Sequence, residues 1–185
     1  MMPVNRCAWP GLTDPLYQQY HDQEWGKLNL DEKYLFEMLV LESFQAGLSW
    51  QTILHRRSNF SKAFAAFDPA EIAHFDSKDF ACLMQNQGII RNRLKIKAAI
   101  NNARVVEQMH QKGETLAGFL QNYVAKPIVN HPQTMADLPA KTTLSTQIAK
   151  GLKKRGFKFM GPVTVYSYLE AVGLINDHLV SCDFK

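Results

Sequence analysis

The sequence has little of what marks secreted or membrane proteins. It contains only three cysteines in 185 residues, an odd number that does not suit a disulfide framework. No apolar run approaches the roughly 20 residues that a membrane-spanning helix needs. The start of the chain, residues 1–6, shows no apolar stretch of the signal-peptide type. We therefore expect a cytoplasmic protein in a reducing compartment, without a membrane partner.

Alternating strand patterns, internal repeats and low-complexity segments are also missing from the sequence. Apolar residues instead recur at helical spacing, and Asp31 and Asp68-Pro69 are strong helix starts. With 46% hydrophobic residues the chain can bury a core. We expect an all-α fold in one domain over residues 1–185, and we allow for two lobes joined by a proline-containing connection at 127–139. Cys82 lies in an apolar helical stretch and is expected to be buried.

The two ends of the chain each carry half of a candidate metal site. Cys7 and His21 lie near the start, and His178 and Cys182 lie near the end. Two thiolates and two imidazoles form a ligand set that suits structural zinc. His178 and Cys182 are four residues apart, so one helical turn would place them on the same face. The spacing is not that of a zinc finger, and a set of scattered residues without a metal is the alternative.

A carboxylate, Glu42, follows the apolar residues 38–41 on a predicted helix. Burial without a partner would cost several kcal/mol or force the carboxyl neutral. Glu42 therefore either faces solvent or is buried for a function. Gly47 predicts a helix break, with Leu48 exposed on the turn and Trp50 starting the next segment.

Aromatic residues are concentrated around the first half of the metal site. Trp9, Tyr17, Tyr20 and Trp25 all lie close to His21 in the sequence. Aromatic side chains usually belong to a core, but beside a buried acid they would form a flat-walled pocket. Such a pocket suits a planar, cationic ring.

Basic residues are concentrated in two runs, within a net charge of +4. One run covers 91–97 and the other 150–158, and each could also be a solvated helix face. The second run leads into a glycine-bounded turn at 156–162 between two predicted helices. Such a helix–hairpin–helix can offer backbone N–H groups to phosphates without reading sequence. The alternative is an ordinary helical hairpin.

Many short segments, in order along essentially the full length, form a recognisable set. They are Cys7 with Trp9, Asp14-Pro15-Leu16-Tyr17, Tyr20-His21-Asp22, Glu24-Trp25-Gly26, Leu41-Glu42, Gln45-Ala46-Gly47-Leu48-Ser49-Trp50, Gly88-Ile89-Ile90-Arg91, Lys154-Arg155-Gly156-Phe157-Lys158-Phe159, Gly161, Asn176-Asp177-His178 and Cys182. In these segments the sequence resembles the bacterial DNA-3-methyladenine glycosylase I family. Two residues depart from the family pattern, because Ser43 and Phe44 stand where Gly and Gln are expected.

The resemblance implies a helix-hairpin-helix glycosylase fold whose termini are joined by one structural Zn²⁺. It implies an enzyme that flips 3-methyladenine out of double-stranded DNA, hydrolyses its N-glycosidic bond and releases the free base. Glu42 would recognise the base and Trp50 would stack on it, and the remaining pocket walls would be Trp9, Tyr17 and Tyr20. DNA contacts are expected from Leu48, Arg91, Lys158 and Gly161, and ligation of the ion from Cys7, His21, His178 and Cys182.

We also expect a monomer. We expect no lyase activity, because no Schiff-base lysine is evident in the hairpin. Asp177 could orient water or brace the metal site, and bracing is the preferred reading. Leu48 could be a wedge into the DNA or ordinary core packing. A non-catalytic binder of damaged DNA, a small-molecule zinc hydrolase and a relative with an altered range of alkylated bases are the competing functions.

Overall fold

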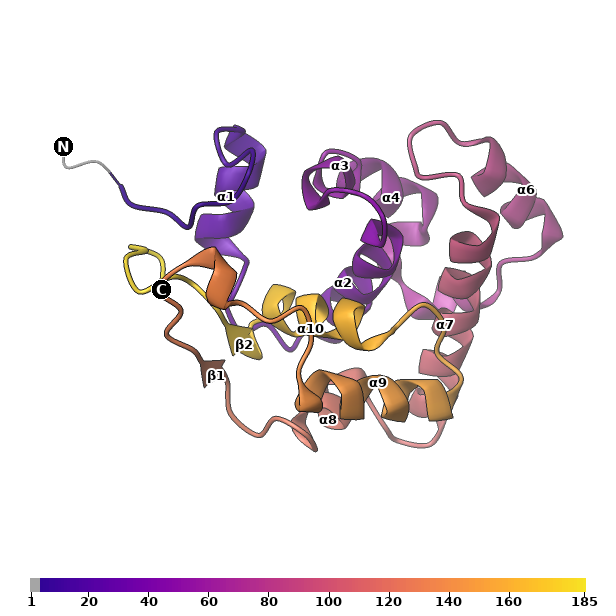
Figure 1. Cartoon of the computed structure of the whole chain (residues 1–185). Helices are drawn as coiled ribbons and strands as arrows, with labels where there is room; N and C mark the ends of the chain where they lie inside the picture. The colour runs from indigo at the N-terminus through magenta and orange to yellow at the C-terminus, as the bar shows by residue number, and fades with distance from the viewer. Residues whose placement is uncertain (1–3) are drawn as a thin grey trace.

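The computed structural model describes residues 4–185 and is mainly helical (Figure 1). No helix in that range combines the length and apolar character needed to cross a membrane. The first described residues and the C-terminus lie on the same side of the molecule, to the left in Figure 1. The helices are α1 (Pro15–Gln23), α2 (Glu32–Gln45), α3 (Trp50–Leu54), α4 (Arg57–Ala63), α5 (Pro69–Ala73), α6 (Ser77–Gln85), α7 (Arg93–Gln111), α8 (Leu116–Gln121), α9 (Thr143–Arg155) and α10 (Pro162–Ala171), with short 3-10 turns η1 (Ala65–Phe67) and η2 (Met135–Asp137).

Helix α2 forms the centre of the core. The Asp31 side chain caps its start by accepting from the backbone N–H of Tyr34, as the sequence predicts. From residue 38 to residue 44 every side chain is buried. The helix packs against α10, α7, α8 and α3, so it is hydrophobic all round rather than on one face. Because every side chain in this part of α2 is buried, the carboxyl group of Glu42 is buried as well.

Helices α9 and α10 form a hairpin joined by a tight turn. Gly156 ends α9 with a φ of 100°, and Phe159 has a φ of 58°, which is rare for a residue with a side chain. Gly161 precedes α10, and Pro162 occupies its first turn. The sequence predicted a helix on each side of this glycine-bounded turn, and the structure has both.

A small parallel sheet is the main difference from the expected architecture. Strands β1 (Ile128–Val129) and β2 (Ile175–Asn176) pair with Ile128 opposite Ile175. Each strand has two residues, too few for an alternating pattern to be visible in the sequence. The sheet attaches the 127–139 connection to the segment that carries the C-terminal metal-ligand candidates.

Cys82 is also placed differently from the sequence prediction. It is exposed on α6, whose buried contact is made by Leu83 instead. The sequence of this nine-residue helix did not show which of its apolar side chains face the core.

Gly173 follows α10 and starts the turn into β2. It has a φ of 73°, and a Cβ there would overlap the backbone of Lys27 and Leu28. Gly113, which follows α7, has the same φ of 73° but no atom within 4 Å of its would-be Cβ.

The two glycines separate conformational strain from a steric clash. We expect Gly113→Ala to lower the free energy of unfolding by about 1–2 kcal/mol, the usual cost of a left-handed conformation. Gly173→Ala should cost clearly more, because two backbone segments must also move apart. Chemical denaturation of both variants measures the difference. Equal losses would contradict the close approach of Gly173 to residues 27–28.

Candidate active site

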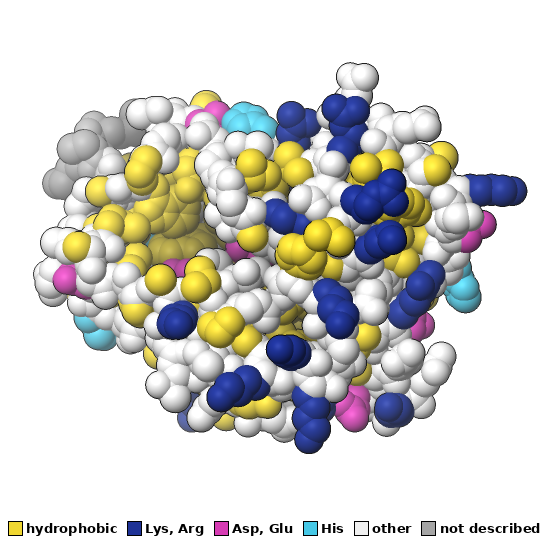
Figure 2. Space-filling view, turned by 45° about the vertical axis from the view of Figure 1, so that its right-hand side comes forward, with side chains coloured by type: hydrophobic (Ala, Val, Ile, Leu, Met, Phe, Trp, Pro, Cys, Tyr) yellow, Lys and Arg dark blue, Asp and Glu magenta, His cyan; other side chains and the backbone are white. Residues whose placement is uncertain are grey.

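A cavity of about 280 Å³ opens between α1, α2, α3, η2 and α10. Figure 2 shows it on the left as a hollow with hydrophobic walls and acidic atoms at its floor. Its volume is close to the lower limit for small-molecule sites, which suits one compact ligand. The lining residues are Trp9, Tyr17, Tyr20, Trp25, Glu42, Gln45, Trp50, Met135, Leu138, Pro139, Ala140, Val163, Tyr166, Ser167 and Glu170. All five residues predicted for the pocket are among them.

Glu42 is only 4% exposed, and its carboxyl lines the cavity. Burial raises the pKa of Glu42 to about 8. Burial is the sole cause, so no side chain or backbone group in residues 4–185 stabilises the carboxylate by charge or hydrogen bonding. The cavity therefore contains an acceptor that lacks a protein partner.

Aromatic rings line the same cavity as this carboxyl. Tyr20 of α1 and Trp50 of α3 lie with ring centroids 5.3 Å apart. Trp9 packs on Tyr17 at 5.2 Å and edge-on against Trp25 at 4.6 Å. Burial raises the pKa of the Tyr17 and Tyr20 hydroxyls, and the Glu42 charge raises each further. Both tyrosines therefore stay neutral and can donate a hydrogen bond into the cavity.

The Ser49 hydroxyl accepts from the backbone N–H of Thr52 and so fixes the start of α3. As predicted, α2 ends at Gln45 and Gly47 has a φ of 85°. Leu48 is 38% exposed on this turn, and Trp50 begins the next helix. The break thus separates an exposed leucine from a tryptophan that faces the cavity.

A second carboxyl, Glu170 of α10, lines the same cavity and was not anticipated from the sequence. Burial, more than the nearby Asp177, raises the pKa of Glu170 far above its usual value. Asp177 accepts from the Tyr166 hydroxyl and, at 2.7 Å, from the Asn130 amide. Because its pKa is raised, Glu170 is protonated and neutral in the folded protein. The spacing of Tyr166 and Glu170, four residues apart on a mostly apolar helix, was the available signal.

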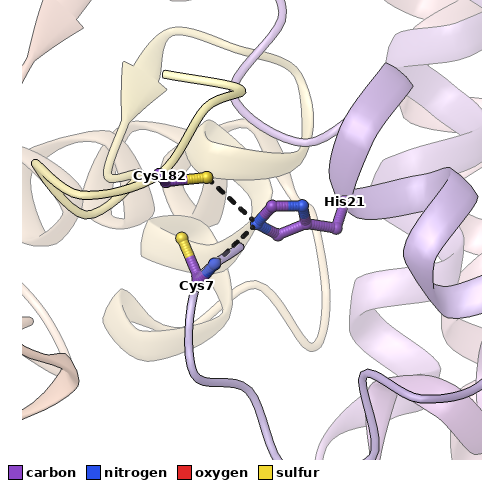
Figure 3. A group of neighbouring side chains, drawn as sticks. All are labelled: Cys7, His21 and Cys182. Atoms are coloured by element: carbon purple, nitrogen blue, oxygen red, sulfur yellow. Dashed lines mark hydrogen bonds between the residues drawn. The ribbon is translucent and has the colours of Figure 1, made fainter. Parts of the chain in front are cut away.

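Cys7, His21 and Cys182 converge from the two chain ends (Figure 3). Their ligand atoms all lie within 4.8 Å of one another, and all three residues are buried. The Cys182 sulfur lies 3.7 Å from His21 Nε2. Tetrahedral zinc, with Zn–S of about 2.3 Å and Zn–N of about 2.0 Å, would hold these two atoms about 3.6 Å apart. The group therefore has the composition and spacing to bind a metal ion.

His178 adjoins this group but is turned away from it. Its ring centroid is 4.9 Å from that of His21, while its Nε2 faces the His21 carbonyl at 3.3 Å. Asn176 accepts at 2.9 Å from His178 Nδ1. The predicted helical turn over 178–182 is wrong, because these residues follow β2 as a loop and turn. His178 and Cys182 reach the same region by chain reversal rather than by helical spacing.

Asp22, not Asp177, orients the metal-ligand candidates. It accepts from His21 Nδ1 at 2.8 Å, which leaves Nε2 free as a ligand. Arg6 holds Asp22 through contacts of 2.7–3.0 Å, and the pKa of Asp22 is lowered by these partners despite burial. No hydrogen bond within residues 4–185 joins the Asp177 side chain to His21 or His178, so the preferred bracing role for Asp177 is wrong.

The candidate DNA-contact residues Arg91, Lys158 and Gly161 are exposed, as is Leu48. Figure 2 shows Lys and Arg side chains gathered around hydrophobic ones beside the hollow. Lys95 differs from its neighbours in the basic run, because it is only 7% exposed. Its ammonium donates to the Phe44 and Ala46 carbonyls at 2.8 and 2.6 Å. Lys95 is therefore occupied by the protein itself.

The departure at Ser43 and Phe44 does not reach the cavity. The Ser43 hydroxyl donates to the Val40 carbonyl at 2.7 Å, and Phe44 packs against Phe60 in the core. Neither residue lines the cavity. The cavity wall is thus unaffected by the two residues that differ from the expected pattern.

Comparison with known proteins places almost the whole chain in one family. The family described as methyladenine glycosylase matches residues 9–185. A protein of Escherichia coli (strain K12) named DNA-3-methyladenine glycosylase 1 is 47% identical over 180 residues, which are 97% of this chain and 96% of that protein. A DNA-3-methyladenine glycosylase of Haemophilus influenzae is 43% identical over 183 residues, or 98% of each chain.

Solved structures agree with the sequence relatives. A crystal structure of 3-methyladenine DNA glycosylase I has a TM-score of 0.94 at 46% identity, covering 97% of this chain and 98% of that one. A variant of such an enzyme in complex with 3-methyladenine has a TM-score of 0.93 at 40% identity, covering 98% of each chain.

The proton on Glu170 makes the stability of the protein depend on pH. Glu170 is neutral when folded but ionises in the unfolded chain near its ordinary pKa, so its contribution is present below that pKa and is lost as pH rises. Glu170→Gln keeps a neutral polar side chain of the same size and cannot ionise. We expect its stability relative to wild type to increase between pH 5 and pH 8 in denaturant titrations. Glu71→Gln, at an exposed position, is the control; a pH-independent loss in Glu170→Gln would contradict the proton assignment.

Proposed function

Because this chain belongs to the methyladenine glycosylase family, we propose that the cavity around Glu42 receives a 3-methyladenine base turned out of DNA. The protein is a DNA-3-methyladenine glycosylase, and it excises this base in DNA repair.

The buried, unpartnered carboxylate of Glu42 is the observation that carries the assignment. Methylation at ring nitrogen makes the adenine in DNA a cation, whereas normal adenine is neutral. A cation bound beside Glu42 supplies the charge and the hydrogen-bond donors that the protein withholds. Normal adenine would leave the carboxyl without a charged partner, which disfavours its entry.

The aromatic walls support the same selection. The faces of Trp50 and Tyr20 attract a cationic ring more strongly than a neutral one. Trp9 and Tyr17 close the far side of the cavity, and the Tyr17 and Tyr20 hydroxyls remain neutral donors. We place the base against Trp50, with its edge toward Glu42.

The reaction needs little help from an acid. Water forms a new bond to the sugar C1′, and the electron pair of the breaking C1′–N9 bond neutralises the departing cation. The released 3-methyladenine therefore leaves without added protons, and the proton of the water passes to solvent. The protein contributes extrusion, positioning and selection of the base. Glu42 acts in selection, and the neutral Glu170 keeps the cavity from carrying a second negative charge.

We propose that α9, the 156–161 turn and α10 form a helix-hairpin-helix that binds the DNA backbone. The turn presents backbone N–H groups near Gly161 and the exposed Lys158, both suited to phosphate contact. Leu48 is exposed beside the cavity and would fill the gap left by the extruded base. Arg91 provides a further phosphate contact. The partner is then double-stranded DNA, bound by one copy of this chain acting as a single domain in the cytoplasm.

We also propose that one structural Zn²⁺ is held by Cys7, His21, His178 and Cys182. Burial raises the pKa of the Cys7 thiol to about 12 and lowers that of His178 to about 4. A neutral imidazole is the form that binds metal, and a thiolate at Cys7 requires a cation nearby. His178 would join the other three by turning its Nε2 away from the His21 carbonyl. Four protein ligands leave no position for reactive water, so the ion fixes structure.

The Glu42 assignment predicts how binding depends on pH. An adenine methylated at N3 and N9 stays cationic at every pH and requires ionised Glu42. Its affinity should rise about tenfold per pH unit below pH 8 and level off above, because the pKa of Glu42 is about 8. Isothermal titration calorimetry at pH 6, 7 and 8 measures this slope.

Two variants sharpen the calorimetry. Glu42→Gln should bind the cation weakly and show no slope, while Glu170→Gln, which changes the other carboxyl of the cavity, should retain the slope. A wild-type affinity that does not change with pH, or a Glu42→Gln variant with unchanged affinity, would remove Glu42 from base recognition.

The metal proposal predicts a loss that extends to the cavity, because Trp9 lines it and lies edge-on to His21 at 4.8 Å. Cys182→Ser should lose stoichiometric zinc and at least about 2 kcal/mol of stability, or roughly 4–8 °C in Tm. It should also bind 3-methyladenine more weakly. Elemental analysis, melting curves and calorimetry test each part. Cys82→Ser, at an exposed thiol, should match wild type in all three; a zinc content that survives in Cys182→Ser would refute the ligand set.

The enzyme should release the base without cutting the strand. The only lysine of the hairpin turn, Lys158, is exposed outside the cavity lining, and Lys95 is committed to backbone carbonyls. Borohydride added during turnover of methylated DNA should therefore trap no covalent complex on a denaturing gel. An adduct lost in Lys158→Gln would show a lyase step.

A further inference from the structure

Helix α7 contacts both segments that face DNA in the proposed function. Near its start Lys95 reaches the turn that carries Leu48, and seven residues later Asn102 reaches the hairpin turn. Seven residues are almost two full turns, so both side chains project from one face, about 10 Å apart along the axis. Figure 1 shows α7 beside the turn that joins α9 to α10.

Lys95 is used entirely by the end of α2. Its ammonium donates to the Phe44 carbonyl at 2.8 Å and to the Ala46 carbonyl at 2.6 Å. Phe44 lies in the last turn of α2 and Ala46 is its C-cap residue, so both carbonyls are at the helix end where the dipole favours a positive charge. Within residues 4–185 no carboxylate forms an ion pair with Lys95. Burying an ammonium without a counter-ion costs free energy. The hydrogen bonds of Lys95 offset this cost and fix the backbone that leads into Gly47 and Leu48.

Gln45 completes the shape of this turn. Its amide donates to the Leu48 carbonyl at 2.8 Å, and the Leu48 N–H donates to the Gln45 carbonyl at 2.7 Å. The turn is thus closed on itself on one side and attached to Lys95 on the other. The position of the exposed Leu48 side chain follows from where Lys95 holds Ala46.

Asn102 holds the hairpin in a comparable way. It is fully buried, and its amide acts as an extra peptide unit beside Lys158. The Asn102 amide donates to the Lys158 carbonyl at 3.0 Å and accepts from the Lys158 N–H at 2.8 Å. Its neighbour Asn101 donates to the Gly156 carbonyl at 2.9 Å. The strained turn at Phe159 follows directly, so these bonds stabilise a conformation that the residue itself disfavours.

We propose that Lys95 and Asn102 are positioning residues that fix the Leu48 turn and the hairpin turn at one separation on α7. This inference rests on the proposed function, because it assigns both turns to DNA contact. A duplex bound by the hairpin is then presented to Leu48 in one register, next to the mouth of the cavity. Neither residue touches the base or the reacting atoms.

The proposal separates DNA engagement from base recognition, and the experiment measures both. Lys95→Met and Asn102→Leu should retain affinity for free 3-methyladenine within about twofold of wild type. Affinity for an undamaged duplex and single-turnover release from methylated duplex should each fall by about tenfold or more. For Asn102→Leu, the dependence of duplex affinity on salt should weaken by about one phosphate contact.

Arg104→Met is the matched control. Arg104 lies on the same helix and also donates to backbone carbonyls, those of Ala73 and Phe75, but these belong to the α5–α6 segment. This variant removes the same charge as Lys95→Met without releasing a DNA-facing turn. Its duplex affinity should stay within about twofold of wild type. A loss equal to that of Lys95→Met would show that net charge alone matters and would overturn the proposal.

Conservative and double variants cover the case in which a single variant folds poorly. Lys95→Arg retains the donors and should restore duplex activity. Asn102→Asp retains the acceptor but not the donor, and its duplex activity should be intermediate.

The double variant of Lys95→Met and Asn102→Leu should lose less duplex activity than the product of the two single losses. Displacing one turn already changes its separation from the other, so displacing the second adds less. Independent, multiplying losses, or an equal loss of free-base binding, would overturn the positioning role. Absence of free-base binding in wild type would instead refute the proposed function, while the undamaged-duplex comparison would still test α7.

Discussion

The structure depends on burying one carboxylate where the protein gives it no partner. Glu42 lies in the most buried helix of the fold, and an ionised carboxyl there costs free energy until a donor or a cation arrives. A protein selected for stability alone would place a leucine at this position. In the proposed function this cost makes the cavity prefer a positively charged planar ligand, and the surrounding rings would strengthen the same preference.

The ends of the chain complete that cavity. Trp9 and Trp25 contact the histidines of the metal-ligand group on one side, at centroid distances of 4.8 and 4.5 Å, and line the cavity on the other. The wall opposite α2 is therefore built on a segment that has little secondary structure of its own. Joining residues 7 and 21 to the last residues of the chain, together with the short β1–β2 pairing, gives this segment a fixed place.

The sequence was informative where a residue type is costly to bury, where glycine marks an unusual backbone conformation, or where metal-binding side chains occur together. A carboxylate in an apolar run, a glycine after Ala46 and cysteine–histidine pairs at both ends each indicated a site. The five residues predicted for the pocket all line the cavity, but Glu170 and the other lining residues were not predicted. The resemblance to a known family indicated that these separate features serve one enzymatic reaction. Contacts between distant segments could not be predicted: Glu170 with Asp177, Lys95 with the end of α2, and Asn102 with the hairpin each need the folded chain. The loop geometry of His178 and the two-residue strands were missed because helical spacing was the only pattern available.

We expect Glu42 to be a neutral acid in the free protein and an anion when a cationic adenine is bound. NMR titration of the Glu42 side-chain carboxyl carbon, with and without adenine methylated at N3 and N9, tests this. The midpoint should lie near pH 8 in the free protein and clearly lower in the complex. A midpoint at the ordinary value of a solvent-exposed glutamate in both states, unaffected by the ligand, would contradict it.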